Sequence, residues 1–168
     1  QKVGQAAAEI RRFRPPEPSF AVPSWSFSSS LAIVCLLLHR AAEDLDLLAA
    51  SSTERVAVHV PCTLYHGLRQ PDLVQSILRR AGFDLAETSE PHLCCGSAGT
   101  YNMLQKPLAD QLLARKATNI AATRPDVIAS GNIGCITQLA GEAGAPVVHM
   151  VELLDWATGG PKPAAFAH

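Results

Sequence analysis

Short apolar runs rich in valine alternate with longer segments of helical periodicity over residues 55–157. The runs that predict strands are 56–60, 83–86, 127–130 and 146–150. The segments that predict helices are 71–81, 107–121, 135–141 and 151–157. Strands that alternate with helices are typical of an α/β domain, in which a parallel sheet carries helices on its faces. The predicted fold class is therefore α/β, with the strands at 56–60, 127–130 and 146–150 parallel in one sheet.

Length, composition and charge narrow the classes of function. The chain has 168 residues, of which 48% are apolar and 17% charged, and this suits one folded domain with a core. Its 14 basic and 15 acidic residues give a net charge of -1, and only 5% of its residues are aromatic. This composition argues against a nucleic-acid partner. The apolar run at 31–38 is much shorter than the roughly 20 residues that span a bilayer, so no transmembrane segment is expected.

The pattern divides the chain into three parts. Residues 1–54 are predicted to form an irregular or truncated N-terminal segment with one helix, at 41–50. Four prolines between residues 15 and 23 and five serines between 24 and 30 leave no core-facing pattern, so residues 1–30 are expected to pack few side chains onto the rest. Residues 55–158 form the regular unit, and residues 159–168 are predicted to be a tail.

Four of the five cysteines lie in loops that follow predicted strands. Cys62 follows the first strand, Cys94 and Cys95 lie in the loop after the second, and Cys135 follows the third. The strands of a parallel sheet end at a common edge, where α/β proteins bind their ligands. We therefore expect these four thiols to lie close together and Cys35 to lie apart.

Several kinds of cysteine chemistry are compatible with this arrangement. Free cysteines are often small buried core residues. Disulfides need an oxidising compartment, and the adjacent residues Cys94 and Cys95 are a poor pair on geometric grounds. A redox-active Cys-x-x-Cys motif does not occur in the sequence. Four cysteines from three loops suit thiolate ligation of an iron–sulfur cluster or zinc, and ligation is the favoured interpretation.

Three separated strings carry a resemblance to a known family. They are PCTLYHG at 61–67, HLCCGSAGTY at 92–101 and NIGCI at 132–136. In order and spacing they resemble the cysteine-rich CCG domain family, which includes the heterodisulfide reductase B subunit. Within this family the strings resemble the C-terminal part of the glycolate oxidase iron–sulfur subunit. The family pattern ends in Cys-x-x-Cys, and here Asn132 stands in place of the first cysteine of that pair.

The resemblance implies a cofactor and a role. A 4Fe-4S cluster, or alternatively zinc, would be held by Cys62, Cys94, Cys95 and Cys135. The chain would be the C-terminal portion of an iron–sulfur electron-transfer subunit in a flavin-dependent glycolate (2-hydroxy-acid) dehydrogenase or oxidase complex. Its partners would be the flavin-bearing dehydrogenase subunit and other subunits of that complex, and this chain alone would not be catalytic. The expected location is the cytoplasm, with peripheral attachment to the inner face of the cell membrane as an alternative.

A zinc-binding or metal-free docking domain of such a complex is the competing interpretation of the function. The residues next to the cysteines are assigned supporting roles. His66 and His92 are expected to hydrogen-bond the ligands, and Gly96 to let the backbone approach the cluster closely. Asn132 is a poor ligand for a soft metal and is expected to hold a turn. His59, which lies within a strand pattern, is interpreted as structural.

Overall fold

The computed structural model describes residues 53–166. Within them, four strands form one sheet in the order β2-β1-β3-β4, and all three neighbouring pairs are parallel. This confirms the predicted α/β class and the parallel strands. The strand bounds are β1 (Arg55–His59), β2 (Asp84–Ala86), β3 (Val127–Ser130) and β4 (Val147–His149).

The helices follow the strands in the predicted alternation, with two additions. Their bounds are η1, a π-helix (Thr63–Gly67), α3 (Leu73–Arg80), α4 (Tyr101–Leu104), α5 (Lys106–Ala121), α6 (Ile133–Leu139) and α7 (Met150–Ala157). The sequence pattern predicts neither η1 nor α4. Helix α6 begins two residues earlier than predicted, because Asn132 caps it.

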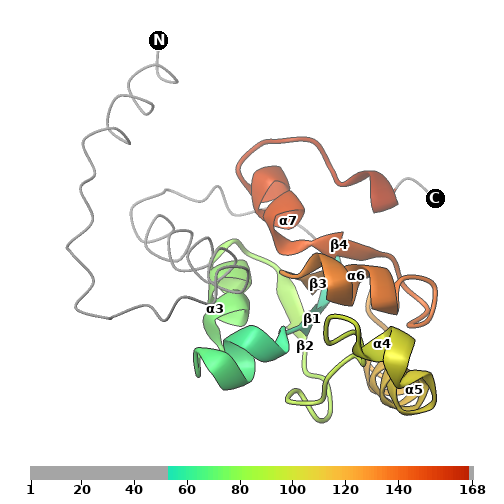
Figure 1. Cartoon of the computed structure of the whole chain (residues 1–168). Helices are drawn as coiled ribbons and strands as arrows, with labels where there is room; N and C mark the ends of the chain where they lie inside the picture. Colours follow the sequence, from blue (N-terminus) through green and yellow to red (C-terminus); the bar gives the residue numbers. More distant parts are fainter. Residues whose placement is uncertain (1–52, 167–168) are drawn as a thin grey trace, which may run out of the picture.

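The two faces of the sheet carry different cores. Val56 and Val58 of β1 belong to a buried cluster that includes side chains of α3 and α7. Ala57 alternates to the other face and belongs to a second cluster with Ile120 of α5 and Leu139 of α6. Figure 1 shows α3 and α7 on the opposite side of the strands from α5. The second cluster also contains two of the cysteines, so the candidate site belongs to the α5 and α6 side of the sheet.

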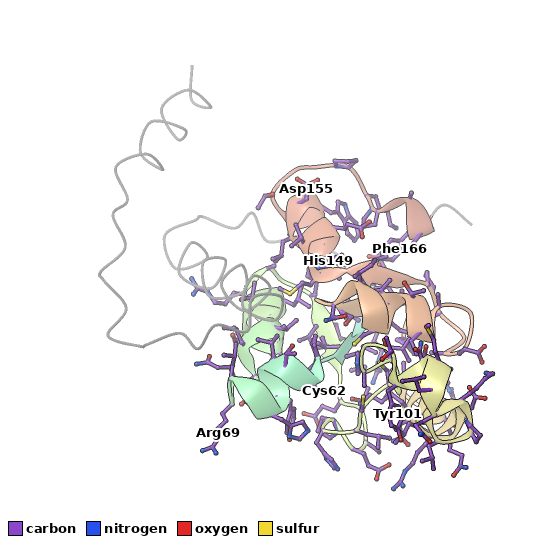
Figure 2. The ribbon with its side chains drawn as sticks, viewed as in Figure 1. Cys62, Arg69, Tyr101, His149, Asp155 and Phe166 are labelled. Carbon is purple, nitrogen blue, oxygen red and sulfur yellow. The ribbon has the colours of Figure 1, made fainter. Side chains whose placement is uncertain are left out.

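The last described residues pack against α7. Residues Ala164–Phe166 form the short 3-10 helix η2, and the Phe166 ring centroid lies 5.6 Å from that of Trp156. The Lys162 ammonium lies 5.1 Å from the Trp156 ring centroid and 2.6 Å from a carboxylate oxygen of Glu54. The predicted tail is therefore anchored to the core as far as Phe166 (Figure 2).

Some predictions lie outside the described residues. These are the helix at 41–50, the packing of residues 1–30 and the position of Cys35. The domain boundaries at 54 and 158 likewise stay predictions. None of the helices within residues 53–166 has the length and apolar character needed to cross a membrane.

Candidate metal centre

The structure places the four cysteines of the strand-end loops together. Cys62 precedes η1 (Figure 2), Cys94 and Cys95 lie in the loop before α4, and Cys135 lies in the first turn of α6. Side-chain hydrogen bonds connect neighbouring thiols in a row, Cys62 with Cys94, Cys94 with Cys95 and Cys95 with Cys135. All four are free thiols. Strands β1 and β3 are neighbours, which explains why Cys62 and Cys135, the two ends of this row, lie at one edge of the sheet.

The thiols differ in acidity because they hydrogen-bond to one another. The pKa of Cys94 falls to about 2, because it accepts hydrogen bonds from the thiols of Cys62 and Cys95 and, at 3.3 Å, from the N–H of Gly96. The pKa values of Cys62 and Cys95 rise, chiefly because each thiol donates to a neighbouring sulfur. The pKa of Cys135 falls to about 5, chiefly through its hydrogen-bond interaction with Cys95. Cys94 and Cys135 therefore favour the thiolate, which is the form of cysteine that binds metals, whereas Cys62 and Cys95 favour the thiol.

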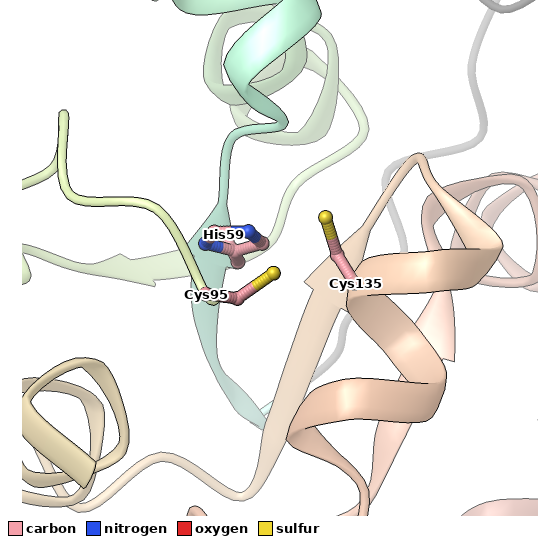
Figure 3. A group of neighbouring side chains, drawn as sticks. All are labelled: His59, Cys95 and Cys135. Carbon is pink, nitrogen blue, oxygen red and sulfur yellow. The ribbon is translucent and has the colours of Figure 1, made fainter. Parts of the chain in front are cut away.

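His59 belongs to this site, contrary to its interpretation as a structural strand residue. It is the last residue of β1 and is completely buried. One ring nitrogen of His59 and the sulfur atoms of Cys95 and Cys135 all lie within 4.8 Å of one another (Figure 3). Neither ring nitrogen has a hydrogen-bond partner of the ordinary nitrogen or oxygen kind, while the ring helps to lower the pKa of Cys135. The sequence does hold a signal for this position. His59 lies two residues after Ala57, so its side chain is on the same face of β1 as Ala57, the face that carries the cysteines.

Lys116 is a second residue that the sequence analysis missed. Its side chain is only 1% exposed, although it lies on the long helix α5. The ammonium donates hydrogen bonds to the carbonyl oxygens of Glu90 at 3.2 Å and Pro91 at 3.3 Å, just before the cysteine pair. Burial lowers the pKa of Lys116, and the nearby thiols, Cys62 foremost, oppose this effect. A buried cation therefore faces the thiol cluster.

The four residues that the sequence analysis assigned supporting roles lie at different places around the cysteines. The His66 ring nitrogen Nε2 lies 3.3 Å from the carbonyl oxygen of His92, and both histidines are exposed. Gly96 has φ +86°, and a Cβ atom at this position would lie 2.5 Å from the carbonyl oxygen of Ala109. Asn132 has an extended backbone and caps α6, and its side-chain oxygen accepts from the N–H of Gly134 two residues on, as in an Asx turn. The role of the four cysteines as ligands, and of these neighbours as their partners, stays a prediction.

The donor set fits a soft or borderline metal. The ring nitrogens of His59 and the hydroxyl of Ser130 are buried and have no nitrogen or oxygen hydrogen-bond partner, and such groups are rare in folded proteins. In register across β1 and β3, Ser130 is paired with His59. Thiolate and imidazole are the ligands that zinc and iron prefer among protein side chains. The residues present therefore suit zinc or an iron–sulfur cluster.

Comparisons with known proteins agree with this site. Residues 56–140 match the model of the CCG cysteine-rich domain family. The chain is 39% identical over 129 residues to the glycolate oxidase iron-sulfur subunit of Escherichia coli K12, covering 77% of this chain and 31% of that protein. It is 25% identical over 112 residues to lactate utilization protein A of Geobacillus thermodenitrificans, covering 63% of this chain and 47% of that protein. The chain thus spans less than half the length of either relative. With half of its residues matched by the family model, it belongs to the CCG cysteine-rich domain family.

Proposed function

We propose that this chain is the C-terminal portion of an iron–sulfur subunit that transfers electrons in a flavin-dependent 2-hydroxy-acid dehydrogenase or oxidase complex, with glycolate as the substrate of the complex. The observation that carries the proposal is the row of four hydrogen-bonded thiols at one edge of the sheet. The similarity to a glycolate oxidase iron-sulfur subunit supports the choice of complex.

Cys62, Cys94, Cys95 and Cys135 would hold the cluster, which we assign to the 4Fe-4S type. When bound, such a cluster accepts and donates single electrons. The protein contributes the geometry: three loops bring the thiols to one place, and the fixed sheet limits how far they can move apart. The buried ammonium of Lys116 offsets part of the negative charge of the thiolates.

The 2-hydroxy acid would be oxidised on a partner subunit that bears the flavin. This chain would relay electrons within the complex, on the cytoplasmic side of the membrane. Both points are inferred from the similarity to a protein described as one subunit of an oxidase. The unit that performs this role would be residues 55–158.

Anaerobic reconstitution of the chain with iron and sulfide tests the proposal. We expect broad visible absorption, which bleaches on reduction and gives an electron paramagnetic resonance signal of a reduced cluster. Zinc is colourless and has no redox chemistry, because its d shell is full. A chain that remains colourless and retains stoichiometric zinc instead would contradict the electron-transfer role and favour a structural, zinc-binding domain.

A further inference from the structure

We infer that His59 supplies a nitrogen ligand to a single metal ion bound together with Cys95 and Cys135, so that the zinc-loaded chain has a mixed thiolate and imidazole site rather than a purely thiolate one. The inference rests on the proposed function in one respect, because it takes Cys95 and Cys135 as ligands. His59 is an additional ligand beyond those of the proposed function. It lies at the end of β1, outside the string HLCCGSAGTY at 92–101.

The first argument for ligation by His59 is the buried environment of its imidazole ring. His59 is 0% exposed, and no nitrogen or oxygen atom hydrogen-bonds to either of its ring nitrogens; the partner of the ring is the sulfur of Cys135. A neutral imidazole has one donor and one acceptor nitrogen, and leaving a nitrogen unpaired in the interior costs stability. A bound metal would satisfy one of these nitrogens. The hydroxyl of Ser130, which is paired with His59 across the two strands and also lacks a partner, is the candidate acceptor for the other.

The second argument is the short distances between the ligand atoms of the three side chains. The ligand atoms of His59, Cys95 and Cys135 all lie within 4.8 Å of one another. Bonds of about 2.3 Å to sulfur and about 2.0 Å to nitrogen place the ligand atoms of a tetrahedral site roughly 3.5–3.8 Å apart. For all three side chains to bind one ion, their ligand atoms must therefore move closer to one another by about 1 Å, and side-chain rotations can provide this movement. Figure 3 shows the three side chains converging from β1, the loop before α4 and the start of α6.

Three other nitrogen- or oxygen-bearing side chains near the cysteines, those of Asn132, His66 and His92, are committed elsewhere or exposed. The Asn132 side-chain oxygen accepts hydrogen bonds from the N–H groups of Gly134 at 2.8 Å and Cys135 at 3.3 Å. His66 and His92 lie at the surface. Among residues 53–166, the group with metal-binding geometry is therefore His59 with Cys95 and Cys135.

Zinc X-ray absorption spectroscopy of the full chain, loaded with one equivalent of zinc under reducing conditions, tests the inference. In the wild type we expect a sulfur shell near 2.3 Å and a nitrogen shell near 2.0–2.1 Å with imidazole multiple scattering. In His59→Gln the imidazole scattering should disappear and zinc affinity should fall at least tenfold. The matched control is His168→Gln, which removes a histidine that is not assigned to the site and should leave both shells and the affinity unchanged.

A second variant separates ligation from a packing role. In His59→Cys the nitrogen shell should be replaced by additional sulfur, with zinc still bound tightly, which a merely structural histidine does not predict. A wild-type spectrum with sulfur only, or imidazole scattering that persists in His59→Gln, would overturn the inference. These results are independent of the visible absorption of the iron-loaded chain, so a failure of the mixed site and a failure of the electron-transfer role are distinguishable.

Discussion

Lys116 shows how a single residue can connect the scaffold to the site. Its stem is buried within α5, and its ammonium holds the carbonyl groups of Glu90 and Pro91. These carbonyls begin the loop that carries Cys94 and Cys95. The same cation lies close enough to the thiols for their charges to raise its pKa against the effect of burial. Lys116 therefore orders the loop and compensates negative charge at the site.

Replacing Lys116 by methionine removes the cation while keeping most of the side-chain volume. The reduction potential of the reconstituted chain should fall, because losing a positive charge disfavours the more negative, reduced state. Two carbonyl groups would also lose their donor, so the free energy of unfolding should decrease by about 1–3 kcal/mol. Redox titration followed by visible absorption measures the first effect, and urea denaturation measures the second.

Lys106→Met is the matched control for this experiment. Lys106 lies on the same helix but is exposed and paired with Asp110 one turn away. Its replacement should leave the potential unchanged and the stability within about 0.5 kcal/mol. An unchanged or higher potential in Lys116→Met would show that its charge does not act on the site.

At the scale of elements, the start of α6 positions the last cysteine. The Asn132 side chain accepts hydrogen bonds from Gly134 and Cys135 and caps the helix. Asn132→Ala should lower the free energy of unfolding of the metal-free chain by about 0.5–2 kcal/mol, whereas Asn132→Asp should retain the cap. Urea denaturation distinguishes the two variants. Equal stability of the alanine and aspartate variants would contradict a capping role.

The loop that carries Cys94 and Cys95 packs closely against α5 at Gly96. Both its positive φ and the 2.5 Å approach of a hypothetical Cβ to the Ala109 carbonyl oxygen exclude larger residues here. Gly96→Ala should destabilise the chain by more than about 2 kcal/mol and displace the adjacent thiols. Thermal unfolding, together with zinc affinity, reports both effects.

Gly99→Ala provides the comparison for this loop. Gly99 also has a positive φ, of +64°, but a Cβ atom at this position meets nothing within 4 Å. We expect a smaller loss, of about 1 kcal/mol, with metal affinity preserved. If both alanine variants behaved alike, backbone conformation alone would account for Gly96 and the close contact with α5 would be unimportant.

The elements that the sequence predicts are those whose pattern is local. Valines at 56, 58 and 60 mark a buried strand, and proline and glycine mark the limits of α3. Helix α4 escapes prediction because its apolar residues Met103 and Leu104 are 73% and 75% exposed, so no core-facing periodicity identifies it.

The site was predictable only in part, for a related reason. The thiols follow strands, so the common edge of a parallel sheet brings them together. His59 and Lys116 reach the same place only because α5 and α6 cover one face of the sheet, and this is a tertiary relation. A histidine in a strand and a lysine on a helix are ordinarily a core residue and a surface residue. Burial, rather than residue type, distinguishes these two.

At the scale of the whole molecule, the parallel sheet explains why one short unit can build a metal centre. The adjacent strands β1 and β3 lead directly to Cys62 and Cys135, and the loop after β2 brings the cysteine pair over the same face. The chain spans 31% of the length of the iron-sulfur subunit it resembles.

The iron and acid-labile sulfide content of the chain after anaerobic reconstitution tests the central claim most directly. Cys35→Ser should contain as much iron and sulfide as the wild type, because Cys35 is not one of the four proposed ligands. Cys95→Ser should lose both, since Cys95 lies between Cys94 and Cys135 in the row of thiols. Circular dichroism of each variant establishes that it is folded. A folded Cys95→Ser chain with as much iron and sulfide as the wild type, or a wild type with neither, would contradict a cluster held by these four cysteines.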